Sequence, residues 1–237
     1  MNIFTRKILR KVNSIKRNNI NSTLLKNRIK LLKTHHITTL LDVGANTGQF
    51  AYYTRHAGYR NRIVSFEPLS EAFSILKSFA ASDPKWDIVN CAMGNKEEEI
   101  EINVSENLQS SSFLDMMPGH VKSAPDSAYV KKEKVKIYRL DDVIGDYTDD
   151  LSHTFLKIDT QGYEKNVLEG AAVSLKEMRG LQLELSLVEL YKGETLFREM
   201  LNYILDQGFT LCSLEPGFTD SQSGQLLQVD AIFYRLG

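Results

Sequence analysis

The stretch Leu40-Leu41-Asp42-Val43-Gly44-Ala45-Asn46-Thr47-Gly48-Gln49-Phe50 decides the fold of this chain. Its apolar first residues predict a strand, two glycines four positions apart predict a tight turn, and Phe50 begins the apolar face of a helix. Glycine lets a ligand come close to the main chain, and a strand-to-helix turn of this kind binds polar cofactors in α/β proteins. We therefore expect Asp42, Gly44, Asn46 and Gly48 to form part of a cofactor site.

A second acidic position indicates a cofactor with a ribose. About 25 residues after Asp42, the mostly apolar run 62–66 ends in Glu67-Pro68. Nucleotide-binding α/β folds hold ribose hydroxyls with an acid at the tip of the second strand. The turn lacks the three glycines over six residues that admit a pyrophosphate. The pattern therefore favours a ligand with one ribose and no phosphate, and it argues against a nicotinamide oxidoreductase.

The composition is that of one ordinary globular domain. The chain has 237 residues, of which 42% are hydrophobic and 25% charged, enough for a sizeable core. No stretch approaches the ~18 apolar residues of a transmembrane helix, and the N-terminus lacks the apolar core of a secretory signal. The two cysteines, Cys91 and Cys212, are far apart, as is typical of free thiols in a reducing compartment. We therefore expect a cytoplasmic protein.

The formal net charge of -1 conceals an asymmetry. Residues 1–41 hold ten Lys and Arg and no acid, which leaves 19 basic and 30 acidic residues, a net charge of -11, in the remainder. We expect residues 1–36 to form a basic helical arm and residues 37–237 the main domain. Apolar residues at helical spacing are compatible with peripheral membrane contact through residues 1–20. A helix packed on the domain edge, or a solvated arm, fits the same pattern.

Strand and helix signals alternate from residue 38 onward, which predicts a mostly parallel sheet with helices on both faces. The expected strands are 38–43, 62–66, 86–91, 154–158 and 181–185; the expected helices are 48–57, one capped by Ser70, 164–168 and 195–205; the expected antiparallel pairs are 99–104 with 134–138 and 209–214 with 226–234. The polar, Ser-rich stretch 105–132 lacks periodicity. Long stretches of this kind are usually functional, so it is a candidate substrate lid, with a plain surface excursion as the alternative.

Taken together, these segments resemble the FkbM family of S-adenosylmethionine-dependent methyltransferases over about residues 38–235. The motifs that carry the resemblance are Leu41-Asp42-Val43-Gly44-Ala45-Asn46-Thr47-Gly48, Phe66-Glu67-Pro68, Asn90-Cys91-Ala92-Met93-Gly94, Ser110-Ser111-Ser112, Arg139-Leu140-Asp141-Asp142, Leu156-Lys157-Ile158-Asp159-Thr160-Gln161-Gly162-Tyr163-Glu164 and Val229-Asp230-Ala231-Ile232-Phe233. The combination of Asp-Val-Gly-Ala-Asn with Lys-Ile-Asp-x-x-Gly-x-Glu is the specific part.

The resemblance implies a Rossmann-like class I methyltransferase fold, with a mostly parallel seven-stranded sheet and an antiparallel closing strand. It also implies S-adenosyl-L-methionine as cofactor, and transfer of a methyl group to a hydroxyl of a sugar, glycan precursor or natural product. On this basis the main chain at Gly44 and Gly48 should face the methionine part, with Asp42 nearby. Glu67 should accept hydrogen bonds from both ribose hydroxyls, and Asn90 and Ala92 should lie at the adenine edge. The alternative for Asp42 and Glu67 is helix capping.

Methyl transfer is an in-line displacement, so the acceptor oxygen must be held on the axis of the methyl–sulfur bond and must lose its proton. Asp159, at the tip of the fourth strand, is the first choice for the base or the orienting group, since such sheets bind ligands there. Lys157 faces the same side of the strand and needs a partner if it is buried. It would pair with an acid, stabilise a developing alkoxide, or extend to the rim of the sheet. Glu184, on the next strand, is the second candidate acid.

Other polar residues are weaker candidates. Four acids, Asp159, Glu164, Glu184 and Asp230, could assemble a magnesium site, but nothing in their spacing demands one, so no metal is predicted. Glu164 opens a helix, where capping would explain it. His120 and His153 lie in polar segments, which favours surface positions.

Two other functions compete with O-methylation. A nucleic-acid amino-methyltransferase usually carries an Asn/Asp-Pro-Pro-aromatic motif after the fourth strand, where this chain reads Asp159-Thr160-Gln161-Gly162. No basic patch is apparent in the main domain either, although the basic arm could bind RNA. A non-catalytic module that only binds the cofactor is disfavoured by the intact acidic and glycine positions.

Overall fold

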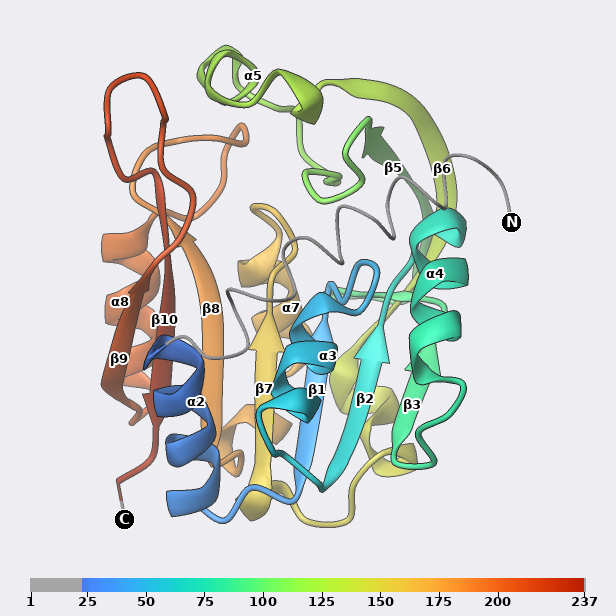
Figure 1. Cartoon of the computed structure of the whole chain (residues 1–237), viewed down its shortest axis with the longest axis vertical. Coiled ribbons are helices and arrows are strands. Elements are labelled where there is room, and N and C mark those ends of the chain that lie inside the picture. Colours follow the sequence, from blue (N-terminus) through green and yellow to red (C-terminus); the bar gives the residue numbers. More distant parts are fainter. Residues whose placement is uncertain (1–22, 237) are drawn as a thin grey trace.

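The computed structural model describes residues 23–236, so the predicted amphipathic segment 1–20 lies outside the described residues. The main feature is a seven-stranded sheet of order β3-β2-β1-β7-β8-β10-β9 (Figure 1). Its strands are β1 (Thr39–Val43), β2 (Arg62–Phe66), β3 (Trp86–Val89), β7 (Thr154–Ile158), β8 (Gly180–Ser186), β9 (Thr210–Pro216) and β10 (Gln228–Tyr234). Strand β10 runs antiparallel to both of its neighbours, β8 and β9. The other neighbouring pairs of this sheet are parallel. The predicted mostly parallel sheet with an antiparallel closing strand is confirmed.

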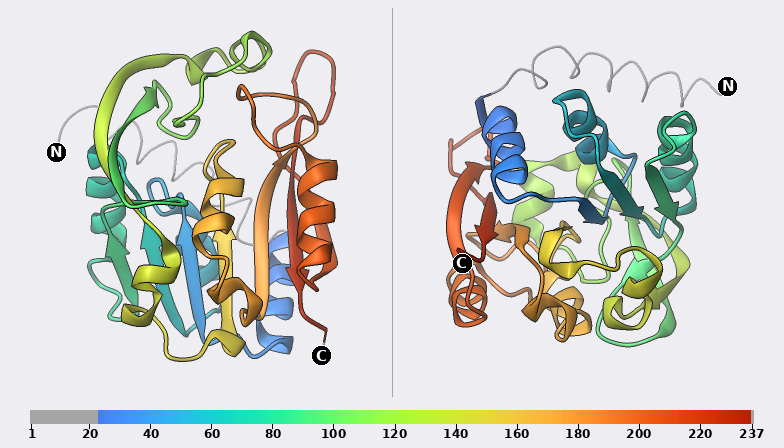
Figure 2. Two further views of the ribbon diagram at one scale, coloured as in Figure 1. Left: turned by 180° about the vertical axis from the view of Figure 1, so that it is seen from behind. Right: turned by 90° about the horizontal axis from the view of Figure 1, so that it is seen from below.

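Helices cover both faces of this sheet, as Figure 2 shows in the view from below. One face carries α2 (Thr23–Thr34), α3 (Gln49–His56) and α4 (Ser70–Ala80); the other carries α6 (Leu140–Val143), α7 (Glu164–Gly170) and α8 (Phe197–Asp206). Each layer buries its apolar stripe against the sheet. Ile29 and Leu32 of α2 pack in one core cluster, and Val167 and Leu168 of α7 pack in the other. Single-turn 3-10 helices lie at Pro125–Ser127, Ile144–Asp146, Leu151–His153 and Ser174–Lys176.

The order of the strands creates a crevice at the carboxyl ends of β1 and β7. The chain moves outward from β1 through β2 to β3 and then returns to β7 on the other side of β1. Val43 is paired with Ile158, so the turns after β1 and β7 leave the sheet at the same level. Open α/β sheets bind ligands at such a switch point. The predicted first and fourth strands are therefore placed side by side.

A second, three-stranded sheet rises over the carboxyl ends of the main sheet (Figure 1). It consists of β4 (Ala92–Met93), β5 (Glu98–Ser105) and β6 (Tyr129–Tyr138). The predicted pairing of 99–104 with 134–138 is confirmed, with Ile100 opposite Val135. We call β5, β6 and the segment between them, residues 98–138, the arm. This arm is a different segment from the basic N-terminal residues 1–36.

The segment 105–132 is more regular than its sequence predicts. It contains α5 (Pro118–Ser123), and β6 begins at Tyr129 rather than near residue 134. The first half of β6 is exposed and carries Val130, Lys131 and Lys132 in succession. An exposed strand has no core face to enforce alternation of apolar and polar residues, which explains why the pattern was not visible.

Two further details differ from the prediction. The third strand ends at Val89, before Cys91, and the short β4 follows it. Ser70 begins α4 but its side chain caps nothing; instead the Glu133 carboxylate of the arm accepts a hydrogen bond from the Ser70 amide at 2.8 Å. None of the helices between residues 23 and 236 has the length and apolar character needed to cross a bilayer.

Candidate active site

A cavity of about 350 Å³ lies at the carboxyl ends of the central strands, beneath the arm. Its walls fall into two parts. The apolar half is lined by Glu67, Leu69, Ala92, Met93, Ile102, Leu108 and Phe113. The polar half is lined by Arg28, Lys157, Asp159, Gln161, Gln182, Glu184 and Asp230. The turn after β1 adds Gly44, Ala45 and Asn46 to the wall.

This turn is pressed against the end of β7. Gly44 has φ +73°, and a Cβ there would lie 1.8 Å from the backbone oxygen of Asp159, so only glycine fits. The amides of Gly44 and Ala45 both donate to the Phe66 carbonyl, at 3.1 and 3.0 Å. Gly44 and Asn46 line the cavity, whereas Gly48 does not. Gly48, at φ +87°, packs beside Leu76 and serves the turn into α3.

Glu67 is the one acid of the apolar half. It is 4% exposed, and its two carboxylate oxygens accept hydrogen bonds from the amides of Asn46 at 2.7 Å and Leu69 at 2.9 Å. Burial raises the pKa of Glu67 to about 7. Each carboxylate oxygen can accept a second hydrogen bond. The backbone therefore fixes this acid in place and leaves it able to receive the two hydroxyls of a ribose.

The remaining residues predicted to bind the cofactor lie in different places. Ala92 lines the apolar half. Asn90 is exposed and outside the cavity wall, and its amide donates to the carbonyls of Glu67 and Pro68 at 2.9 and 3.0 Å. Asp42 is fully buried beneath the turn and does not line the cavity. The contacts of these residues with a cofactor stay predictions. Asn90 braces the segment after β2, and Asp42 supports the turn after β1 through Lys157.

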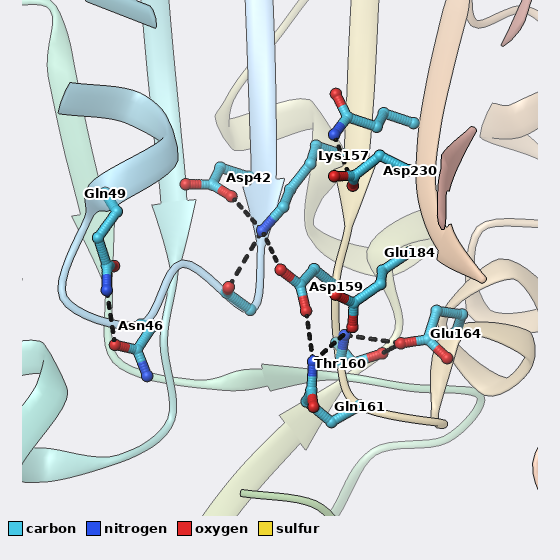
Figure 3. Close-up of polar contacts among 12 residues, drawn as sticks. Asp42, Asn46, Gln49, Lys157, Asp159, Thr160, Gln161, Glu164, Glu184 and Asp230 are labelled. Atoms are coloured by element: carbon cyan, nitrogen blue, oxygen red, sulfur yellow. Dashed lines mark hydrogen bonds and ion pairs between the residues drawn. The ribbon is translucent and has the colours of Figure 1, made fainter. Parts of the chain in front are cut away.

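Lys157 is a buried cation at the base of the polar half (Figure 3). Its ammonium lies 3.0 Å from Asp42 Oδ1 and 3.4 Å from Asp159 Oδ2, and it donates to the Gly44 carbonyl at 3.2 Å. Burial opposes its charge, but the two carboxylates prevail and raise the pKa of Lys157 above its ordinary value. The predicted pairing with an acid is confirmed. The ammonium thus contacts three oxygens, one hydrogen bond and two ion pairs, so Lys157 ties β1, its turn and β7 together.

Asp159 and Glu184 form an acid pair at the ends of β7 and β8 (Figure 3). The Gln161 amide nitrogen donates to Asp159 Oδ1 at 2.9 Å and to Glu184 Oε2 at 2.5 Å. Gln228 donates to the same Glu184 oxygen at 2.9 Å. Burial, together with the charges of Asp159 and Asp230, raises the pKa of Glu184 well above its usual range. Glu184 therefore holds a proton more readily than an ordinary glutamate does.

Gln161 and Tyr191 were missed by the reasoning from sequence. The Tyr191 hydroxyl donates to Gln161 Oε1 at 2.6 Å, and Tyr191 is fully buried. A glutamine two residues after the acid of the fourth strand was a usable signal for Gln161. Tyr191 has no such signal, because it belongs to a loop 30 residues further along the chain.

Glu164 holds the turn after β7. Its Oε1 accepts hydrogen bonds from the Thr160 amide at 2.8 Å, the Thr160 hydroxyl at 3.1 Å and the Gly162 amide at 3.3 Å. Burial raises the pKa of Glu164 to about 7. These partners precede α7, so Glu164 braces the turn and does not cap its helix. Among residues 23–236, no three His, Cys, Asp or Glu are arranged to hold a metal ion.

His120 is not at the surface, contrary to expectation. It is 3% exposed and packs in α5 against the rings of Tyr191 and Phe218 at 5.1 and 5.4 Å. Burial lowers its pKa to about 4, so it stays neutral. The polar sequence around it concealed the apolar partners, which come from other loops. His153, by contrast, is partly exposed, and its Nδ1 lies 2.7 Å from Asp150 Oδ2.

Comparison with known proteins gives one family match. The model of the methyltransferase FkbM domain matches residues 42–211, most of the chain. No curated protein matches the sequence.

Solved structures share the fold at low identity. TrmK of M. capricolum, in complex with S-adenosyl-homocysteine, has a TM-score of 0.50 and 8% identity, covering 92% of this chain and 70% of its own. An rRNA methylase of Streptococcus thermophilus has a TM-score of 0.47 and 11% identity, covering 89% and 95%. Magnesium protoporphyrin IX methyltransferase of Synechocystis has a TM-score of 0.46 and 10% identity, covering 99% and 85%. At these identities the similarity concerns the Rossmann-like architecture alone.

Proposed function

The chain belongs to the methyltransferase FkbM family and is an S-adenosylmethionine-dependent methyltransferase; we propose that it methylates a hydroxyl of a sugar, glycan precursor or natural product. The observation that carries this proposal is the Asp159–Glu184 pair, which stands beside the turn of the cofactor site. A hydroxyl needs a base, because its proton must leave as the new carbon–oxygen bond forms.

The cofactor fits the apolar half of the cavity. Glu67 offers two fixed carboxylate oxygens for the ribose hydroxyls. Beside it, Ala92, Ile102 and Phe113 give the apolar surface that an adenine ring needs. When bound, S-adenosylmethionine supplies an electrophilic methyl group on a sulfonium. We place its methionine part along Gly44 and Asn46, toward the polar half.

We propose that Glu184 and Asp159 have different roles toward the acceptor hydroxyl. We assign the proton-accepting role to Glu184, because it lines the cavity and burial together with the neighbouring carboxylates raises its pKa, which makes it a better base than an ordinary glutamate. Asp159, held by Lys157 and Gln161 on its two oxygens, orients the acceptor hydroxyl. The Lys157 ammonium is already engaged by Asp42, Asp159 and the Gly44 carbonyl, so we assign it the role of positioning Asp159 and the turn rather than of stabilising an alkoxide. This assignment replaces Asp159 by Glu184 as first choice for the base.

The charge of the polar half supports an acceptor without phosphates. Three carboxylates, Asp159, Glu184 and Asp230, line it against two cations. Both cations are already paired: Lys157 with Asp42, and Arg28 with Glu215 at 2.6 Å. Such a wall repels a phosphate backbone and accepts hydrogen bonds from hydroxyls. This disfavours a nucleic-acid substrate.

The arm serves as the cover of the site in this proposal. Leu108, Gln109, Ser111 and Phe113 of the predicted lid line the cavity. A cover that excludes water protects a reactive cofactor.

We further propose a cytoplasmic location, which the free thiols of Cys91 and Cys212 support. Peripheral membrane contact through residues 1–20 is tested by deleting them; unchanged binding to anionic vesicles would remove that idea.

The test is methyl transfer from cofactor labelled with ¹³C in the methyl group. The full chain is incubated with a panel of monosaccharides, nucleotide sugars, lipid-linked glycans, polyketides and tRNA, and products are examined by ¹³C NMR. The proposal expects an O-methyl resonance with a hydroxyl compound that disappears in Glu184→Gln. An N-methyl product, or transfer to RNA alone, would overturn it.

A further inference from the structure

We propose that Gln161 is a positioning residue that decides which oxygen of the acid pair receives the acceptor proton, namely Oε1 of Glu184. The inference rests on the proposed role of Glu184 as the base. It concerns a residue that neither touches the methyl group nor exchanges a proton itself.

The side-chain amide of Gln161 bridges the two acids. Its nitrogen lies 2.9 Å from Asp159 Oδ1 and 2.5 Å from Glu184 Oε2. An amide nitrogen carries two hydrogens and is a donor only. One hydrogen therefore points to each carboxylate, and both facing oxygens must act as acceptors.

This arrangement excludes a proton from both facing oxygens. A proton on Asp159 Oδ1 or Glu184 Oε2 would oppose an N–H of Gln161. Asp159 Oδ2 lies 3.4 Å from the Lys157 ammonium, which disfavours protonation there as well. Among residues 23–236, Glu184 Oε1 is the carboxylate oxygen of the pair that has neither a hydrogen bond nor an ion pair. Because Glu184 also lines the cavity, we place the acceptor proton on this oxygen.

Two other loops hold the Gln161 amide in this orientation. The buried Tyr191 hydroxyl donates to Gln161 Oε1 at 2.6 Å, which directs the nitrogen toward the acids. The Ser112 hydroxyl of the arm donates to the Gln161 carbonyl at 2.7 Å. Gln161 has φ +57°, an uncommon conformation for this residue type that surrounding contacts must support. The acid pair is thus connected through Gln161 to the arm and to the loop after β8.

Other charged and titratable groups face Glu184 from every packed element, and the test must separate them from Gln161. They are Asp159 and Lys157 from β7 and its turn, Glu164 from α7, Asp230 from β10 and Tyr191 from the loop after β8. None of them is altered when Gln161 is replaced by leucine, which has a similar size but no donor. A shift in the titration of Glu184 on this replacement therefore reports the amide.

The experiment follows Glu184 by ¹³C NMR in the full chain with carboxyl-labelled glutamate, with its signal assigned from its loss in Glu184→Gln. Loss of two donated hydrogen bonds disfavours ionised carboxylates and lets the pair share a proton. In Gln161→Leu the titration midpoint of Glu184 should rise by about one pH unit or more. Tyr191→Phe should raise it less, because the amide is retained but no longer held. Gln222→Leu, an exposed turn position, is the matched control and should leave it unchanged.

An unchanged midpoint in folded Gln161→Leu would overturn the inference. If Gln161→Leu does not fold, Tyr191→Phe serves as the test. An unchanged titration midpoint of Glu184 in Tyr191→Phe would then overturn the inference. The titration requires no acceptor and no methyl transfer. A Glu184→Gln protein that still methylates would overturn the proposed function while leaving the role of Gln161 in the titration intact.

Discussion

The two halves of the cavity are built by different kinds of hydrogen bond. In the apolar half, Glu67 is held by the backbone amides of Asn46 and Leu69. In the polar half, side chains hold one another: Lys157 with Asp42 and Asp159, and Gln161 with Asp159, Glu184 and Tyr191. A backbone-held group keeps its place when a neighbouring side chain changes. A group held by side chains is adjustable, and removing one member disturbs the rest.

This difference matches the proposed division of labour. The cofactor is a constant ligand, and a backbone frame suits it. The acceptor varies between enzymes of one fold, and chemistry is adjusted by side chains placed on a common frame. Substitutions in the two halves should therefore have separable effects, and the following predictions proceed from the largest expected effect to the smallest.

Glu184→Gln should break the chemistry of the polar half and leave the apolar half intact. Loss of the base should lower the rate of methyl transfer by about 10²–10⁴-fold, whereas the affinity for S-adenosylhomocysteine should be unchanged. The rate is measured as release of S-adenosylhomocysteine with the acceptor found in the panel, and the affinity by calorimetry. A parallel loss of both would contradict the separation of the halves.

Lys157→Met should show how strongly the polar half depends on one buried ion pair. Removing the ammonium leaves Asp42 buried without its cation, so the free energy of unfolding should fall by about 3–5 kcal/mol. Urea denaturation measures this loss. The double variant Asp42→Asn/Lys157→Met removes both charges and should recover part of it. Equal stability of the single and double variants would show that the pair is not the cause.

Glu67→Ala should damage the apolar half alone. The lost charge-assisted hydrogen bonds to the ribose correspond to about 1.5–3 kcal/mol, or roughly ten- to hundredfold weaker binding of S-adenosylhomocysteine. Calorimetric titration gives the affinity, and circular dichroism checks the fold. Glu99→Ala, an exposed position on β5, is the matched control. Unaltered affinity in Glu67→Ala would remove this residue from the cofactor site.

The pH dependence of binding should follow Glu67, whose pKa burial raises to about 7. Its ionised form is the better acceptor, so affinity for S-adenosylhomocysteine should fall by up to about tenfold between pH 8 and pH 6. The stability of the fold changes with pH in the opposite direction. A raised carboxyl pKa stabilises the fold at low pH, and this contribution is lost as pH rises from the unfolded value through about 7. Calorimetry of the wild type and of Glu67→Gln, as ligand titration for affinity and as thermal unfolding for stability, tests both pH dependences. Each dependence should be weaker in Glu67→Gln.

Reasoning from sequence succeeded where local periodicity and turn chemistry decide the outcome. The strands 62–66 and 154–158 coincide with β2 and β7, and the arm pairing followed from alternation in β5. The same reasoning placed Glu67 and Gly44 at the cavity, because a strand tip and a glycine turn have one geometry in this fold. It missed the first half of β6 and the burial of His120, since neither is encoded in neighbouring residues.

The sequence alone determined the sheet, its turns and the backbone-held half of the site, because backbone hydrogen bonding and side-chain periodicity act over a few residues. Tertiary structure decided the polar half. Gln161 meets Glu184 across 23 positions and Tyr191 across 30, and Gln182 meets Asp230 across 48. Which of several acids faces an amide, and which of its oxygens stays free, depends on packing between strands that no local pattern records.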